Sequence, residues 1–376
     1  MSRQRSSHPF AVAVLLVAAA LVGALAIGSI WANRQLLDTG SWVSVSGRML
    51  ESREVRHRLA VFLADELVAE AEAQLGAVGG DEVAAEVLPR LRRQGPHLAE
   101  QAMTTPQFRA VWLRANRTAH RELLRVLDEE APRRAGGVVI NLTPALRELA
   151  GSVSGTDLAE SIGVGDLGSL VEPGAARIEV LEAEELDQAQ DAVGAIRSLP
   201  VPATIAFLVL FALALLLGRA RLDRTILGVG LSLAAAGALA LLARAIAGHA
   251  IVDDLLSRDA DREAAEAAWR IATSTIVDLS AAAIGLGALI ALWAVLAGES
   301  RFAIGFRQAL APLLRTPLAR LWMLLLAIVV FLALMVLSPI AAFEHPLGIA
   351  LFAAVFAAGA LALARLTIVE SEPAPG

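Results

Sequence analysis

Six apolar segments, each close to the length of a membrane-crossing helix, constrain this chain more than any other feature. The hydrocarbon core of a bilayer is about 30 Å thick, and a helix needs about 20 apolar residues to cross it. The segments lie at residues 10–31, 201–218, 226–247, 276–297, 321–340 and 347–364. We therefore predict a mainly α-helical protein with six transmembrane helices: the first followed by an insert at 32–199, and the other five forming a bundle over 200–366.

The composition agrees with a membrane protein and excludes several kinds of chemistry. Hydrophobic residues make up 56% of the chain and charged residues 19%, with a mean hydropathy of +0.62, whereas soluble domains average about 45–50% and about 25%. The net charge of −6 argues against nucleic-acid binding. The chain has no Cys, which excludes disulfides and thiolate chemistry. All 32 basic residues are Arg, so no P-loop lysine exists and ATP hydrolysis is not expected.

Arginine residues near the ends of the spans predict the orientation in the plasma membrane. Short cytoplasmic segments carry more Arg than short segments on the opposite side. With the N-terminus inside, the cytoplasmic segments hold ten Arg residues: 3, 5, 219, 221, 224, 301, 307, 315, 320 and 365. The short loops outside hold three: 258, 262 and 270. We therefore place the 1–9 tail and a disordered 367–376 tail in the cytoplasm, and residues 32–199 outside.

The first span admits two interpretations. The tripeptide Ala24-Leu25-Ala26 is typical of a signal-peptide cleavage site. However, the apolar run continues to Trp31, which makes it long enough to cross the bilayer as an uncleaved signal anchor. We expect the signal anchor.

The insert is acidic and mostly helical, with 18 Arg against 26 Asp and Glu over 33–199. Apolar residues at helical spacing predict helices at 52–75 and 81–93. Thr105 and Pro106 are typical of a helix start and predict a third helix, and a fourth covers 184–198. Two β-like runs, 138–142 and 177–181, are candidates for a small two-stranded sheet. Between spans three and four, an amphipathic helix is expected to lie on the insert or on the membrane surface.

No catalytic, cofactor or metal site is predicted. The six His residues are scattered and never show the i, i+4 spacing of a zinc helix. The G-x-S-x-G pattern of a hydrolase nucleophile does not occur. His120 is interpreted as a hydrogen-bonded helix residue and not as a ligand. We therefore expect a protein that is not an enzyme.

Arg244 and Asp278 are the two charged residues within the spans, and both lie near the outer end. Small residues lie on one face of each helix: Gly228, Ser232, Ala236 and Ala240 recur every four positions on one, and Ala281, Gly285 and Ala288 share a face with Asp278 on the other. Such faces let membrane helices approach closely. We hypothesise that these two faces pack together and that Arg244 pairs with Asp278. The alternative is that Arg244 snorkels to the interface and Asp278 caps its helix.

Three stretches carry a resemblance to a known group of proteins. They are T-T-P-Q-F-R-A-V-W at 104–112, continuing with R-A-N-R at 114–117 to A-H at 119–120; W-A-N at 31–33 with L-L-D-T-G-S-W-V at 36–43; and residues 138–142. They resemble a group of uncharacterised actinobacterial integral membrane proteins. The resemblance implies one span, a helical extracytoplasmic domain and a C-terminal bundle of five spans, and it implies no catalytic residues.

Two functions remain open at this point. The first is a non-enzymatic envelope protein that binds, senses or scaffolds an extracytoplasmic protein or small molecule through its acidic insert, anchored in the lipid bilayer. The alternative is a permease-like component of an exporter, which requires a separate ATPase docking on the Arg-rich loop at 299–320.

The Arg244–Asp278 hypothesis is tested by exchanging the two charges. We expect Arg244→Asp and Asp278→Arg each to lower the thermal unfolding midpoint of the purified protein, because each leaves two like charges facing one another in a medium of low dielectric constant. The double exchange should restore most of the loss. If it restores none, the two residues do not pair.

Overall fold

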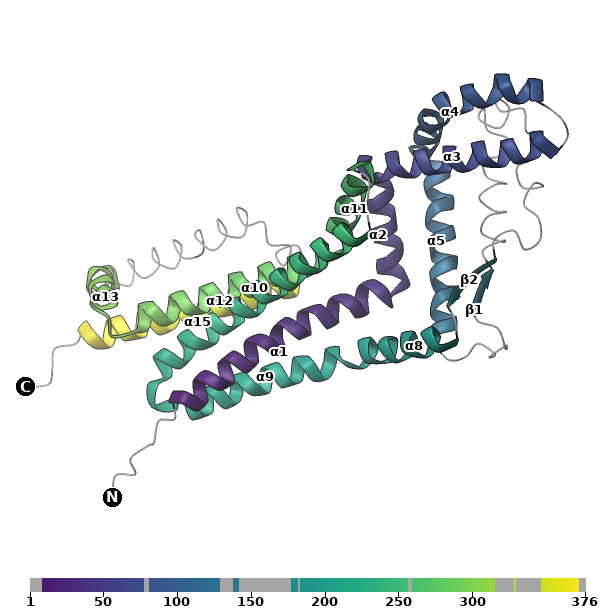
Figure 1. Ribbon diagram of the computed structural model, residues 1–376. Helices are drawn as coiled ribbons and strands as arrows, with labels where there is room; N and C mark the ends of the chain where they lie inside the picture. Colours follow the sequence, from purple (N-terminus) through teal and green to yellow (C-terminus); the bar gives the residue numbers. More distant parts are fainter. Residues whose placement is uncertain are drawn as a thin grey trace, which may run out of the picture. The chain divides into compact units, whose positions relative to one another are not determined.

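The computed structural model describes residues 9–77, 81–128, 138–141, 177–181, 183–255, 259–314, 328 and 346–371, and almost all of them are helical. The chain divides into two compact units (Figure 1). The first, here named the apolar unit, comprises Met1–Trp31, Ser198–Ile246 and Ser274–Gly376. The second, the insert unit, comprises Ala32–Arg197 and Ala247–Thr273.

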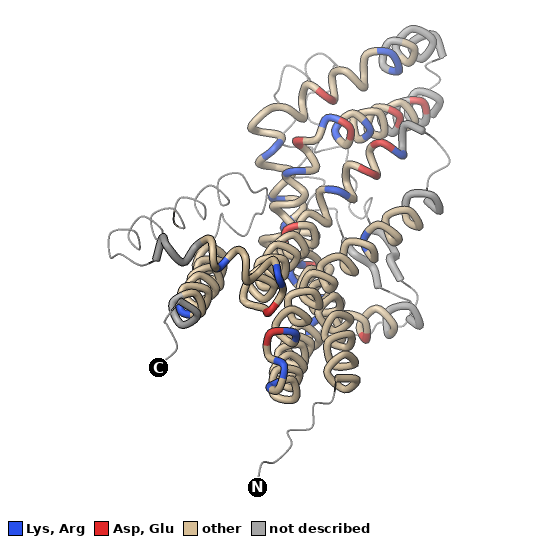
Figure 2. The backbone as a smooth tube through the Cα atoms, turned by 90° about the vertical axis from the view of Figure 1, so that its left-hand side faces the viewer, with Lys and Arg blue, Asp and Glu red and all other residues tan. Residues whose placement is uncertain are grey.

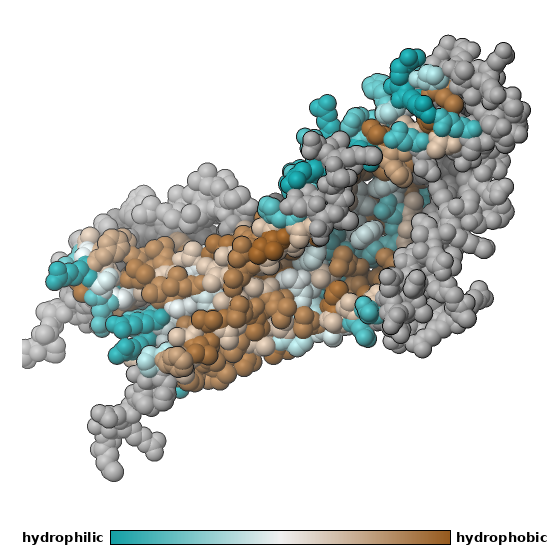
Figure 3. Space-filling view, viewed as in Figure 1, coloured by the Kyte–Doolittle hydropathy of each residue, from teal (hydrophilic) through white to brown (hydrophobic). Residues whose placement is uncertain are grey.

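Long apolar helices build the first unit. Within the described residues, five are long and apolar enough to cross a membrane: α1 (Pro9–Leu36), α9 (Pro200–Leu217), α10 (Leu222–Leu255), α12 (Ser274–Ala297) and α15 (Pro346–Ser371). Their large side chains face outward, as with Phe10 (81% exposed) and Leu347 (83%), and Figure 3 shows these helices covered by hydrophobic residues. Figure 2 shows few charges along them. Such surfaces suit lipid rather than water, so the chain is consistent with a membrane protein. The predicted span at 321–340 lies outside the described residues, except Ile328.

The small-residue face predicted on α10 packs against α1 instead of α12. The Ser232 hydroxyl donates a hydrogen bond of 2.6 Å to the Leu16 carbonyl. A methyl group on Gly228 would lie 2.5 Å from Leu16 Cδ1, and one on Gly23 would lie 2.9 Å from Ala236 Cβ. The predicted partner for this face was therefore wrong, because a four-residue repeat identifies a face of a helix and not the neighbour that covers it.

A second small-residue face of α10 contacts α12. A methyl group on Gly230 would lie 2.7 Å from the Gly287 carbonyl oxygen, and one on Gly287 would lie 2.6 Å from the Ala234 nitrogen. Gly237 approaches the Ser280 carbonyl in the same way. Residues 228 and 230 are about 200° apart around a helix, so α10 presents small residues to both neighbours and its backbone approaches α12 closely.

A buried arginine binds the carbonyl groups at the end of α12. The next helix, α13 (Arg301–Leu314), carries Arg307, which is 3% exposed. Its guanidinium donates to the Leu296 carbonyl at 2.7 Å and to the Gly298 carbonyl at 2.8 Å. The last carbonyls of a helix have no partner within the helix, so Arg307 satisfies them and ties α13 to α12. The sequence analysis did not predict α13.

The insert unit contains six helices within the described residues. They are α2 (Thr39–Glu51), α3 (Arg53–Ala77), α4 (Asp81–Met103), α5 (Pro106–Leu127), α8 (Ala183–Ser198) and α11 (Asp259–Ala272). α3 packs along α4, and α11 packs against α3 and α2. The hydrophobic core contains the buried residues Leu50, Ala60 and Met103, and Phe108 and Trp112 pack against them.

A two-stranded antiparallel sheet joins distant parts of the insert. β1 (Val138–Asn141) pairs with β2 (Arg177–Leu181), with Ile140 opposite Ile178 and an irregularity between Val138 and Val139. The runs at 138–142 and 177–181 therefore meet as the sequence analysis suggested, with residue 142 outside the described residues.

Several predicted helix boundaries need correction. The helix predicted at 81–93 continues to Met103, because Pro89 and Pro96 are accommodated within α4. The tail predicted to be disordered from residue 367 is helical as far as Ser371. α2 was not predicted at all: its alternation of Val and Ser lacks the usual apolar helical repeat.

Glycine substitutions test the close contact between α10 and α12. Gly230→Ala and Gly287→Ala place a methyl group against backbone atoms, so the helices must move apart, at a cost of about 1–3 kcal/mol for overpacking. We expect a lower thermal unfolding midpoint in mild detergent. Gly28→Ala is the matched control, because that glycine has no atom within 4 Å of the added carbon, and it should unfold no earlier than the natural chain. An unchanged midpoint for Gly230→Ala and Gly287→Ala would contradict the close contact.

Candidate functional site

The most organised polar cluster of the insert unit begins at the start of α2. Asp38 is the N-cap: its Oδ1 accepts a hydrogen bond of 2.7 Å from the Ser41 backbone N–H. This bond, with one from the Ser41 side chain, lowers the pKa of Asp38 below its ordinary value of 3.8. Because the folded-state pKa is lowered, the stabilisation is present at neutral pH and is lost as the pH falls through the lowered pKa. Asp38-Thr39-Gly40-Ser41 therefore fixes where α2 begins.

His120 of α5 lies against this helix start. Its ring stacks on Trp42 with a centroid distance of 4.9 Å and an interplanar angle of 24°. Nδ1 lies 3.1 Å from the Thr39 hydroxyl oxygen, and Nε2 lies 3.1 Å from the Leu36 carbonyl oxygen. The residue is 2% exposed. We name Thr39, Trp42 and His120 the histidine junction; it joins the 36–43 and 104–120 stretches.

The hydrogen-bond partners show how both ring nitrogens are used. A carbonyl oxygen only accepts, so Nε2 donates to Leu36. Nδ1 shares a hydrogen bond with the Thr39 hydroxyl, which can donate or accept. With both nitrogens engaged and the ring buried, His120 has no lone pair to offer a metal or a substrate. The histidine junction is a structural lock between the end of α1, the start of α2 and the middle of α5.

Further contacts hold α2 on α5. The Trp112 indole N–H donates to the Ser46 carbonyl at 3.0 Å. Arg109 and Glu51 form an ion pair between exposed side chains. A methyl group on Gly47 would lie 3.1 Å from Leu113 Cδ2, so the two helices approach closely here. The pairing of these helices therefore combines apolar packing with a directional bond from a half-buried indole.

The other end of α5 is tied to α8. Arg197 and Asp128 form an ion pair at 2.7 Å, and the Gln190 amide donates to the Val126 carbonyl at 3.3 Å. The Asn33 amide in turn donates to the Ile196 carbonyl at 3.4 Å. The end of α8 therefore lies beside the last turn of α1.

Two other described histidines, His57 and His97, have hydrogen-bond partners outside this cluster. His57 lies 3.3 Å from Glu100, and His97 lies 3.1 Å from Gln101. Arg244 on α10 and Asp278 on α12 are each partly buried, and each takes part in an interaction; their pairing stays a prediction. Among the described residues, no group of three His, Asp or Glu side chains is placed to hold a metal ion.

The contacts of His120 with Thr39 and Trp42 were not predicted from the sequence. The signal was present in part: Asp38 before Thr39-Gly40-Ser41 is typical of a helix start, and His120 follows an apolar face of α5. The comparisons with protein-family models, with curated proteins and with solved structures find no match to this chain.

Replacing His120 tests its role as a lock. We expect His120→Ala to lower the free energy of unfolding of the insert unit by about 2–4 kcal/mol, because it leaves a cavity and unpaired partners. His97→Ala removes an exposed imidazole and should stay within about 0.5 kcal/mol. Denaturant unfolding of the full chain, followed by Trp fluorescence, measures both. Equal losses in the two variants would contradict the assignment.

Proposed function

We propose that this chain is a multipass plasma-membrane protein whose acidic helical insert binds a polypeptide partner outside the cytoplasm. The proposal assumes the orientation predicted from the distribution of Arg residues, with both termini in the cytoplasm and residues 32–199 outside. It is supported by α11, which lies between α10 and α12 in the chain and packs on α2 and α3. Both outer segments of the predicted topology thus contribute to one unit, as expected if they lie on the same side of a membrane.

The observation that carries the proposal is an exposed aromatic side chain on α3. Phe62 is 52% exposed, although the neighbouring Leu59 and Leu63 pack against the core of the insert unit. Asp65, Ala69 and Glu72 follow it along the exposed side of the helix. We name Phe62, Asp65, Ala69 and Glu72 the α3 outer face. Aromatic anchors ringed by polar residues are typical of protein–protein binding sites.

The charge of the insert indicates the chemistry of the partner. The insert carries 18 Arg against 26 acidic residues. On the α3 outer face, Glu72 is paired with Arg92 of α4, while Asp65 is exposed. An acidic surface speeds encounter with a basic partner and discriminates against acidic ones. We therefore expect a partner with a basic surface and an apolar pocket that accepts Phe62.

The proposal is tested by purifying the full chain from native membranes in mild detergent and identifying co-purifying proteins by mass spectrometry. We expect one extracytoplasmic protein in stoichiometric amount. Phe62→Ala should reduce its recovery at least about tenfold, the loss typical of removing an aromatic hot spot. Arg117→Ala on α5 changes another exposed residue of the insert unit and should leave recovery unchanged.

Other outcomes would overturn the proposal. If no partner is recovered, or if Phe62→Ala and Arg117→Ala behave alike, the α3 outer face is not a binding site. Stoichiometric recovery of an ATPase subunit would favour the exporter alternative instead. In that alternative Arg307 could not serve as a docking residue, because it is buried on the carbonyls of α12; Arg301 is exposed, and Arg315 and Arg320 lie outside the described residues.

A further inference from the structure

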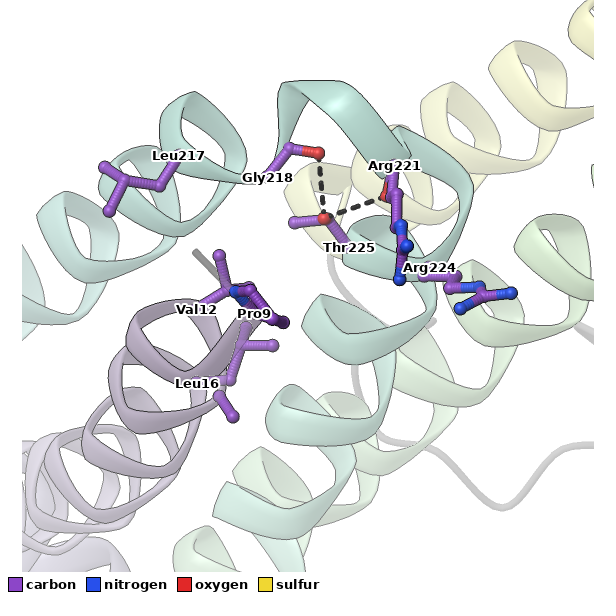
Figure 4. A pocket seen from close by; sticks show the side chains of 9 residues that line it. Pro9, Val12, Leu16, Leu217, Gly218, Arg221, Arg224 and Thr225 are labelled. Carbon is purple, nitrogen blue, oxygen red and sulfur yellow. Dashed lines mark hydrogen bonds between the residues drawn. The ribbon is translucent and has the colours of Figure 1, made fainter. Parts of the chain in front are cut away.

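A pocket in the apolar unit lies where α1, α9 and α10 meet. Its volume is about 240 Å³. Figure 4 shows the elements that line it: Val12 and Leu16 come from α1, Leu217 from the end of α9, and Arg221, Arg224 and Thr225 from the following turn and the start of α10. The pocket therefore has an apolar wall and two guanidinium groups.

The turn that carries the arginines is held by internal hydrogen bonds. η1 (Arg219–Arg221) links α9 to α10. The buried Thr225 hydroxyl lies 3.2 Å from the Gly218 carbonyl and 3.0 Å from the Arg221 carbonyl, and donates to them. A methyl group on Gly218 would lie 2.1 Å from Thr225 Oγ1, so only glycine fits. The backbone beneath Arg221 and Arg224 is thus preorganised.

The turn carries a net positive charge on exposed side chains. Arg219, Arg221 and Arg224 outnumber Asp223, the acid among them in the sequence. Arg221 and Arg224 are exposed, and in the part of the chain that the structure describes neither forms an ion pair. Guanidinium groups bind phosphate oxygens through paired hydrogen bonds. The expected ligand group at the pocket mouth is therefore a phosphate.

The rest of the pocket identifies the source of the phosphate. Its wall is formed by the ends of three helices that are each apolar and long enough to cross a bilayer, which corresponds to the headgroup level of a membrane. A free phosphate ion gains nothing from Val12, Leu16 and Leu217, whereas a phospholipid places its glycerol and first methylenes there. Basic pockets between membrane helices bind anionic lipid headgroups.

We propose that this pocket is a binding site for one anionic phospholipid, with its phosphate on Arg221 and Arg224 and its upper acyl chain along α1 and the end of α9. The site does not depend on the partner of the insert unit. By the arginine bias, it lies in the cytoplasmic leaflet.

The test is lipid binding to the full chain in detergent, measured by native mass spectrometry and by thermal stabilisation with added phosphatidylglycerol or phosphatidylcholine. We expect retention of one phosphatidylglycerol and a preference for it over phosphatidylcholine. Arg221→Gln with Arg224→Gln should weaken phosphatidylglycerol binding about tenfold or more. Arg301→Gln with Arg365→Gln removes the same charge from exposed positions outside the pocket and its turn and should keep the preference.

A further variant separates loss of binding from loss of folding. Ala13 of α1 also lines the pocket. Ala13→Trp fills its apolar part and leaves both arginines, so it should also abolish the preference, while each variant keeps its unfolding midpoint in the absence of lipid. Equal losses in the two double variants would mean general surface attraction and overturn the proposal. So would equal binding of the two lipids, or full competition by inorganic phosphate, which would indicate a free-phosphate site.

Discussion

A helix surrounded by hydrocarbon has no water to satisfy its backbone, so every N–H and C=O group must be bonded within the chain. The apolar unit meets this constraint, because five of its described helices are continuous and are long and apolar enough to cross a membrane. Their hydroxyl groups obey the same rule by bonding to nearby carbonyls: Ser29 to Ala26, Thr204 to Pro200, and Thr367 to Leu363. Arg307 extends the principle to the end of α12, where its buried guanidinium occupies carbonyls that would otherwise lack donors.

Inside a membrane, lipid is as apolar as Leu, so the hydrophobic effect does not bring helices together and close packing must do so. α10 shows how. It presents small residues to α1 around Ser232 and to α12 around Gly230, so two neighbours approach its backbone. A small residue also lies at the turn before α10. Gly218 contacts Thr225 there, and the proposed lipid pocket lies beside Leu217.

The insert unit has a core of buried apolar side chains. Phe108 and Trp112 of α5 pack against the cluster that contains Leu50 and Met103. The start of α5 could be predicted from the sequence, because Thr105 caps the helix by accepting from the Phe108 N–H and Pro106 follows it. The histidine junction could not be predicted, because no local pattern indicates that a His on one helix stacks on a Trp of another.

The sequence by itself determined that the chain is helical, which segments are apolar enough to cross a membrane, and where α5 and the paired strands lie. These properties depend on residues close together in the chain, whose periodicity and capping chemistry are local. Only the tertiary structure decided which faces meet. The bond from His120 to Leu36 spans 84 residues and that from Ser232 to Leu16 spans 216, and side-chain packing between distant segments selects such partners. A face of small residues specifies a close approach, and the surrounding helices decide what approaches it.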